Sequence, residues 1–247
     1  MAPPTVSKAT PATALRVIDL GRDVPYAAAL DVQRSVNQAV IDGDAPPTVL
    51  LLEHPPVITV TNRPGARDHL LASPDRLAEL GIAVVDTDRG GDITYHGPGQ
   101  LVAYPILPLS PLGLNLSRYM RLLERVVIDT VASFGVTGLA EAGATGVWVD
   151  GAGPADTSAK LCAMGVRVRR NTTLHGLALN ITTDLAHFDT IVPCGLAGRA
   201  VTALSALLGE RCPAMGKVKS ALSEQLGAAL GLTLEPATPP AAWRLER

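Results

Sequence analysis

Short runs of apolar residues recur along most of the chain and predict strands. The run at 48–53 is continuous, which is typical of a strand buried on both faces. Further runs predict strands at 15–20, 57–61, 82–86, 101–107, 146–149, 160–169 and 172–181. Between and after these runs, apolar residues recur at helical spacing. Strands and helices therefore alternate through the length of the chain.

Capping residues predict where the helices begin and end. The expected N-terminal caps are Asp23, Ser73, Asn115 and, for a short helical turn through Phe188, Asp184. The expected ends are at Asp42 before Gly43, at Gly81, near Phe134 before Gly135, and at Gly231 for a last amphipathic helix from Met215. The longest of these helices begins at Asn115, and its apolar stripe indicates packing against the core without implied chemistry.

Alternation along 160–169 assigns its side chains to two faces of one strand. Lys160, Cys162, Met164, Val166 and Val168 are expected on one face, and Leu161, Ala163, Gly165, Arg167 and Arg169 on the other. Lys160 then points toward the interior, where a cation is costly and tends to lose its proton. The alternative is that Lys160 lies at the strand end and reaches water.

Composition narrows the class of protein. The chain has 247 residues, 47% hydrophobic and 18% charged, so it is long and apolar enough for a sizeable core. A net charge of −2 argues against a dedicated nucleic-acid-binding protein, and no run is long enough to span a membrane. Three cysteines without paired spacing fit a reducing cytoplasm and give little support for zinc, so no metal and no cofactor are predicted.

The two ends of the chain are expected to lie outside the folded domain. Residues 1–13 are rich in Pro, Ala and Thr and lack the apolar core of a secretory signal, which predicts a disordered extension. Residues 235–247 are Pro-rich and predict a loose tail. The remaining 14–234 are expected to form one catalytic domain.

Three stretches carry candidate chemistry. Residues 89–100 contain four glycines together with Arg, Tyr, His and Gln, which favours a binding loop over a plain glycine-rich hairpin. His175 and Gly176 interrupt the strand at 172–181, although a single His in a strand is often a core residue. Cys194 lies between Pro193 and Gly195 in a turn that presents its side chain, unless it is an ordinary buried thiol.

Four motifs in order, RGGDITYHGPGQL (89–101), KLCAMGVRV (160–168), TLHGLALNI (173–181) and DLAHFDTIVPCG (184–195), resemble those of the lipoyl(octanoyl) transferases. The resemblance extends from about Leu15 to Gly231. It implies an α/β (α+β) fold like that of the biotin and lipoate protein ligases, with a central mixed, largely antiparallel sheet flanked by helices. Members transfer an octanoyl group from acyl carrier protein to a lysine of lipoyl domains, through a cysteine thioester and without ATP.

The resemblance also implies the site residues. Cys194 matches the nucleophile and Lys160 the lysine that activates it. The substrate-binding residues implied are Arg89, Gly90, Gly91, Asp92, Ile93, Thr94, Tyr95, His96, Ala163, Met164, Gly165, His175, Gly176 and Leu177. Two departures stand out: Thr61, followed by Asn62, replaces a usual Gly, and Cys162 replaces a usual Ala, which makes Cys162 a rival for reactivity on the Lys160 face.

The implied partners are octanoyl-acyl carrier protein as donor, and lipoyl domains of 2-oxoacid dehydrogenase complexes and the glycine cleavage H protein as acceptors. Arg167, Arg169 and Arg170, grouped at one strand end, either attract these acidic partners or form an ordinary solvated face. Three alternative functions stay open at this point: an ATP-dependent lipoate or biotin ligase, a cysteine thioesterase, and a non-catalytic acyl-carrier-binding module.

Overall fold

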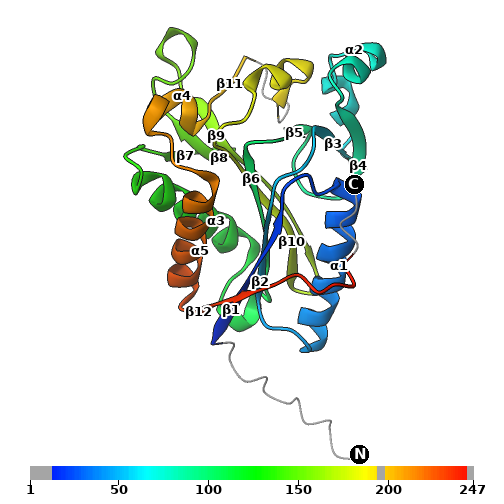
Figure 1. Ribbon diagram of the computed structural model, residues 1–247, viewed down its shortest axis with the longest axis vertical. Helices are drawn as coiled ribbons and strands as arrows, with labels where there is room; N and C mark the ends of the chain where they lie inside the picture. The colour runs from blue at the N-terminus through cyan, green and yellow to red at the C-terminus, as the bar shows by residue number, and fades with distance from the viewer. Residues whose placement is uncertain (1–12, 194–197, 244–247) are drawn as a thin grey trace, which may run out of the picture.

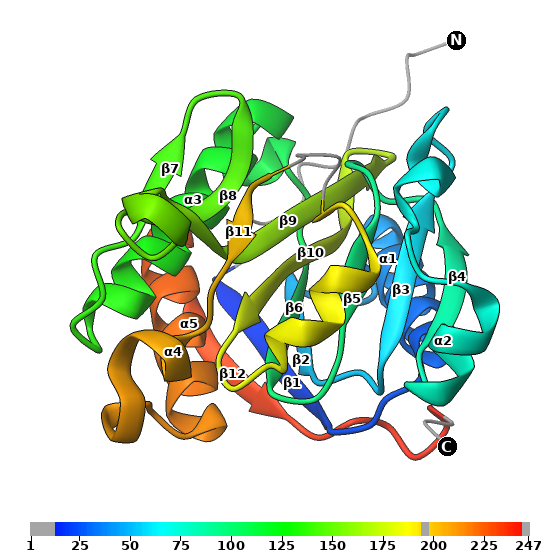
Figure 2. The same cartoon turned by 90° about the horizontal axis from the view of Figure 1, so that it is seen from above.

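The computed structural model describes residues 13–193 and 198–243. The expected N-terminal extension, apart from Thr13, and Cys194 with its following glycine therefore lie outside the described residues, as do 244–247. Within the described residues, nine strands form one sheet in the order β12-β1-β2-β6-β10-β9-β8-β7, with β11 pairing to β9 (Figures 1 and 2). Its strands are β1 Ala14–Gly21, β2 Thr48–Leu52, β6 Gln100–Ile106, β7 Leu139–Glu141, β8 Ala144–Val149, β9 Ala159–Arg169, β10 Thr172–Asn180, β11 Ala200–Val201 and β12 Thr233–Ala237.

The sheet is mixed and largely antiparallel. The pairs β12–β1, β1–β2 and β11–β9 are parallel, whereas the pairs from β2 to β7 along the sheet are antiparallel. A second sheet has the order β4-β3-β5, with β3 Val57–Thr61, β4 Ala83–Thr87 and β5 Thr94–His96. The expected fold class is confirmed by this arrangement.

Helices cover both faces of the large sheet (Figure 1). The helices are α1 Tyr26–Asp42, α2 Pro74–Glu79, α3 Leu116–Ala132, α4 Leu204–Leu208 and α5 Met215–Leu230, with 3-10 turns at Ala66–His69, Ser110–Leu112, Pro154–Asp156, Leu185–Thr190 and Gly209–Arg211. On one face α3 and α5 pack over the sheet around one apolar cluster, and on the other face α1 packs over β2, β6 and β10 around a second cluster. Among the described residues, no helix is long and apolar enough to cross a bilayer.

Most predicted caps are confirmed. The side chains of Ser73, Asn115 and Asp184 each accept a hydrogen bond from a backbone N–H of the first turn. Asp23 is the exception: α1 begins at Tyr26, with Pro25 at the cap position and no side-chain cap. Asp23 instead adopts a left-handed backbone with φ 57° in a bend after β1, and Val24 N–H donates to Glu53 O at 3.0 Å, so the helix begins only after Pro25.

The folded domain extends beyond the expected boundary at Leu234. Glu235, Pro236 and Ala237 form the end of β12 and pair in parallel with Arg16, Val17 and Ile18 of β1. Pro236 is tolerated because β12 is an edge strand, where a missing backbone donor can face away from the sheet. The first three residues of the stretch predicted to be loose therefore complete the sheet.

Candidate active site

An irregularity in β9 decides which way Lys160 points. Val147 of β8 pairs with Cys162, but the next residue, Trp148, pairs with Lys160, so one extra residue of β9 is accommodated. Leu161 and Cys162 consequently both pack into the cluster beneath α3 and α5. Lys160 lies on the opposite face, where it lines a small hollow together with Ala163. The prediction that Lys160 and Cys162 share one face is wrong, because the bulge breaks the alternation of side chains along β9.

The bulge also removes Cys162 as a reactive rival. Its side chain is fully buried, and burial raises the pKa of this thiol to about 12. Gly146 permits the close packing opposite it, because a Cβ there would lie 2.5 Å from the Cys162 carbonyl oxygen. Cys162 is therefore a core residue, as buried free cysteines usually are.

Lys160 is buried, with 6% of its surface exposed, and its Nζ lies 4.7 Å from the centroid of the Trp148 ring. The hollow that it lines also includes Pro193, Asn180 and Phe188. Lys160 is thus held inside the protein beside the residue that precedes Cys194 in the chain. The prediction that it points inward is confirmed, and the alternative of a lysine reaching water is wrong.

A second hollow adjoins the first through Thr94, Ala163 and Ala178, which line both. Its floor is made by small residues on the same face of β9 and β10. Ala163 pairs directly with Ala178, and Gly165 with Gly176. A Cβ on Gly176 would lie 2.2 Å from Ala103 O, so the backbone there needs glycine. The cavity exists because two neighbouring strands omit large side chains at paired positions.

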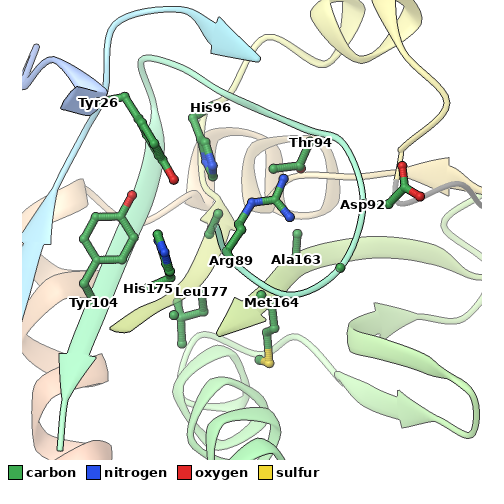
Figure 3. A pocket seen from close by; sticks show the side chains of 14 residues that line it. Tyr26, Arg89, Asp92, Thr94, His96, Tyr104, Ala163, Met164, His175 and Leu177 are labelled. Atoms are coloured by element: carbon green, nitrogen blue, oxygen red, sulfur yellow. The ribbon is translucent and has the colours of Figure 1, made fainter. Parts of the chain in front are cut away.

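The glycine-rich stretch covers this cavity as a roof tied to β9. Gly90 N–H donates to Val166 O at 2.9 Å, and a Cβ on Gly165 would lie only 2.6 Å from Gly90 O. Arg89 donates from Nε and Nη2 to Thr59 Oγ1 at 3.2 and 2.8 Å, and its guanidinium lies in the middle of the cavity (Figure 3). Close backbone approach therefore explains the glycines of the binding loop.

Thr61, the departure from the usual glycine, has a clear place in this arrangement. Its hydroxyl donates to Gly91 O at 3.1 Å and accepts from Arg63 N–H at 3.4 Å. The end of β3 is therefore tied to the glycine-rich stretch by a side chain that glycine would lack.

Several polar side chains also line this cavity. Tyr26, Arg89, His96, Tyr104 and His175 all line it, and Figure 3 shows their polar ends converging. Burial lowers the pKa of the His96 and His175 side chains, so both rings are neutral near pH 7. His175 adopts φ 59°, a strained backbone for a non-glycine residue, and its Nε2 lies 2.9 Å from Asp88 Oδ1.

The predicted substrate-binding residues divide into three groups. Those that line the cavity are Arg89, Gly91, Asp92, Thr94, His96, Ala163, Met164, Gly165, His175, Gly176 and Leu177. Gly90 does not line it but packs on its β9 wall. Ile93 and Tyr95 instead are buried in the apolar cluster beneath the second sheet. The side chains of Met164 and Leu177 turn away toward α3 (Figure 3), so these two contribute mainly backbone to the cavity.

Sequence reasoning missed several residues at the site. Tyr26 and Tyr104 line the cavity, yet one begins a helix and the other lies within an apolar strand run, so neither carries a local signal. His69, whose ring contacts Asp92, lies in a short turn outside the four motifs. Among the described residues, no group of three or more His, Cys, Asp or Glu side chains is placed to hold a metal ion.

Comparisons with known proteins agree with this geometry. Residues 25–227 match the family model of the lipoyl protein ligase A/B catalytic domain. An octanoyltransferase of Chloroflexus aurantiacus is 48% identical over 210 residues, covering 85% of this chain and 91% of the relative. An octanoyltransferase of Geobacter metallireducens is 44% identical over 209 residues, covering 85% and 90%.

A solved structure supports the fold at much lower identity. It contains a bi-partite lipoate protein ligase and its E2 lipoyl domain from Thermoplasma acidophilum, and it matches with a TM-score of 0.71 at 14% identity, covering 94% of this chain and 89% of that one. The matched family model and the identities to the octanoyltransferases show that the chain belongs to the octanoyltransferases of the lipoyl protein ligase A/B family. It is therefore an acyltransferase that transfers octanoyl groups.

Proposed function

We propose that the enzyme takes octanoyl from octanoyl-acyl carrier protein and passes it to a lysine of lipoyl domains through a thioester on Cys194. The observation that carries the proposal is the position of Lys160. It is buried at one end of a hollow floored by small residues, beside Pro193, and the candidate nucleophile follows Pro193 in the chain. A buried lysine next to a thiol is a recurrent way of generating thiolate near neutral pH.

The two half-reactions balance without ATP. In the first, the Cys194 thiolate attacks the thioester carbonyl, the bond to the carrier sulfur breaks, and the carrier leaves as a thiol. In the second, the neutral amine of the acceptor lysine attacks the new thioester, an amide forms, the bond to the enzyme sulfur breaks, and the proton lost by the amine returns to that sulfur to restore the Cys194 thiol. A free thiol is only about 3% ionised at pH 7. The proposed task of Lys160 in the first step is therefore to accept the thiol proton or to stabilise the thiolate by its positive charge.

The octanoyl chain is proposed to lie over the small-residue floor. From Lys160 the two hollows pass Ala163 and Ala178 and then reach Gly165 and Gly176. Two residues of a strand span about 6.6 Å, so the floor from Ala163 to Gly165 would hold part of an eight-carbon chain and the rest would lie toward Lys160. The tail would end against the Arg89 guanidinium and the His175 ring, which line the same cavity.

The acceptors proposed are lipoyl domains of 2-oxoacid dehydrogenase complexes and the glycine cleavage H protein, in the cytoplasm. The two described cysteines, Cys162 and Cys212, are free, which fits a reducing compartment. Of the three arginines expected to attract acidic partners, Arg167 forms an ion pair with Asp88. Arg169 and Arg170 are the exposed members of the group that remain for this role.

Intact mass spectrometry after mixing the enzyme with octanoyl-acyl carrier protein tests the proposal. We expect wild type and Cys212→Ala to gain one octanoyl group and to lose it when a lipoyl domain is added. Cys194→Ser should give no transfer. Near-normal turnover by Cys194→Ser, or transfer that needs octanoate and ATP, would favour the ligase function instead. Release of free octanoate without an acceptor would indicate a thioesterase.

A further inference from the structure

The chain just before Pro193 is fixed by the segment around His69. Val192 N–H donates to His69 O at 2.8 Å, and Leu70 bridges to Ile191. The N–H groups of Leu71 and Ala72 both donate to Thr190 O, at 2.9 and 3.1 Å. Backbone hydrogen bonds therefore hold residues 69–72 against residues 190–192.

The His69 ring continues this contact to the roof of the cavity. Its Nδ1 lies 2.7 Å from Oδ1 of Asp92, a residue of the glycine-rich stretch. Asp92 is 4% exposed, lines the cavity, and also accepts from Ile93 N–H at 2.8 Å. Arg63 lies farther away, at 3.9 Å. A buried carboxylate is stable only with such partners. Loss of the His69 contact would therefore leave the Asp92 carboxylate poorly paired and would disturb the glycine-rich stretch.

Figure 3 shows that the Asp92 carboxylate turns away from Arg89 and the centre of the cavity. The Asp92 carboxylate, expected to bind substrate, lies 2.7 Å from His69 Nδ1 and 3.9 Å from Arg63 Nη1. Its backbone belongs to the roof, and its carboxylate faces the segment that precedes Pro193. The hydrogen bond to His69 thus connects two parts of the site that are far apart in sequence.

We propose that His69 and Asp92 form a positioning pair, which holds the glycine-rich roof and residues 190–192 at a fixed separation. This inference rests on the proposed function, in which Cys194 takes the acyl group from a chain lying in the cavity. The reacting atoms must then approach within about 3–3.5 Å, and a misplacement of 1 Å can cost about 100-fold in rate. Neither side chain is assigned a covalent or proton-transfer role.

Two substitutions of His69 separate positioning from other roles. His69→Asn places an amide N–H close to the position of Nδ1 and keeps a donor for Asp92, whereas His69→Leu removes it. Asp86→Asn is a matched control, because Asp86 pairs with Arg67 of the same short turn at 2.6 Å but both side chains are well exposed. The assay is single-turnover formation of octanoyl-enzyme from a small octanoyl thioester, with the melting temperature measured for each variant.

We expect His69→Leu to acylate about 10- to 100-fold more slowly at saturating donor, with little change in the donor concentration for half-saturation. His69→Asn and Asp86→Asn should stay within about threefold of wild type. A His69→Leu variant as fast as wild type overturns the inference, and so does a stable His69→Asn that is as slow as His69→Leu. If His69→Leu does not fold, a tenfold loss in stable His69→Asn overturns it and normal activity supports it. Failure of wild type itself to form octanoyl-enzyme counts against the proposed function instead.

Discussion

Lys160 is held by a combination of burial and aromatic contact. Lys160 Nζ lies over the Trp148 ring, and the Arg199 guanidinium also packs on that ring, 3.9 Å from its centroid. Arg199 is itself paired with both carboxylate oxygens of Glu141, at 2.7 and 2.6 Å. Cation–π contacts become stronger when water is excluded, so this surrounding fixes the lysine without exposing it.

Lys160→Arg is expected to slow octanoyl-enzyme formation by about 100-fold or more, with the fold intact. Arginine keeps the charge, but it does not give up its proton and its planar group requires a differently shaped space. The rate of octanoyl gain by mass spectrometry measures the effect, and circular dichroism checks the fold. Full activity of Lys160→Arg would mean that the positive charge alone is needed.

Side chains that act through local geometry could be anticipated, whereas those that act through distant partners could not. The capping roles of Ser73 and Asn115 follow from three or four neighbouring residues, and both predictions are confirmed. The face of Lys160 was predicted wrongly because a bulge depends on the opposing strand. The His69–Asp92 contact joins residues 23 positions apart in separate turns, so no local pattern signals it.

Strands β9 and β10 perform two structural tasks with their two faces. On one face Cys162, Leu177 and Leu179 pack beneath α3 and α5. On the other, the paired small residues Ala163 with Ala178 and Gly165 with Gly176 leave the cavity open. The length of the hollow is set by rigid sheet backbone. We therefore expect the preference for acyl length to depend on which of these positions stays small.

Ala163→Val should shift the preference toward shorter chains. The added methyl groups project into the cavity where the two hollows join, so transfer of an eight-carbon chain should fall about tenfold and that of a six-carbon chain much less. The ratio of single-turnover rates for the two donors measures the shift. Cys162→Ala, on the opposite face of the same strand, is the control. An unchanged ratio in Ala163→Val would mean that the chain lies elsewhere.

At the scale of the whole molecule, buried neutral histidines link its parts. His54 is buried between the chain entering α1 and β6, with Nδ1 2.6 Å from Val24 O and Nε2 2.8 Å from the Tyr104 hydroxyl. His96 connects the second sheet to β6 through Gln100 at 2.7 Å. His175 connects β10 to the loop that carries Asp88. Each neutral ring stabilises the fold through these contacts, and a protonated ring at the same buried position would destabilise it.

Stability is therefore expected to fall as the pH drops below about 6.5. Burial lowers the pKa of His54 to about 4, and it also lowers the pKa of His96 and His175. The unfolded chain thus binds these protons first, and each histidine costs about 1.4 kcal/mol per pH unit while only the unfolded form is protonated. Urea unfolding between pH 7 and 5 measures the slope, and His54→Gln should reduce it by about one proton. A stability that is flat over this range would contradict the prediction.

The bulge in β9 has a consequence for how the enzyme can change over evolution. Lys160 faces the cavity because β9 has one extra residue opposite β8 at that point. The function of the lysine therefore depends on the pairing register of the two strands as well as on the residue type at position 160. Substitutions in β8 that restored regular pairing, with no residue removed, would turn Lys160 toward the apolar cluster that contains Cys162. The apolar content of the strand would be preserved, and a sequence comparison would register a conserved motif in an enzyme with no lysine in its cavity. The pairing register between β8 and β9 thus carries information about activity that the motif of β9 alone does not.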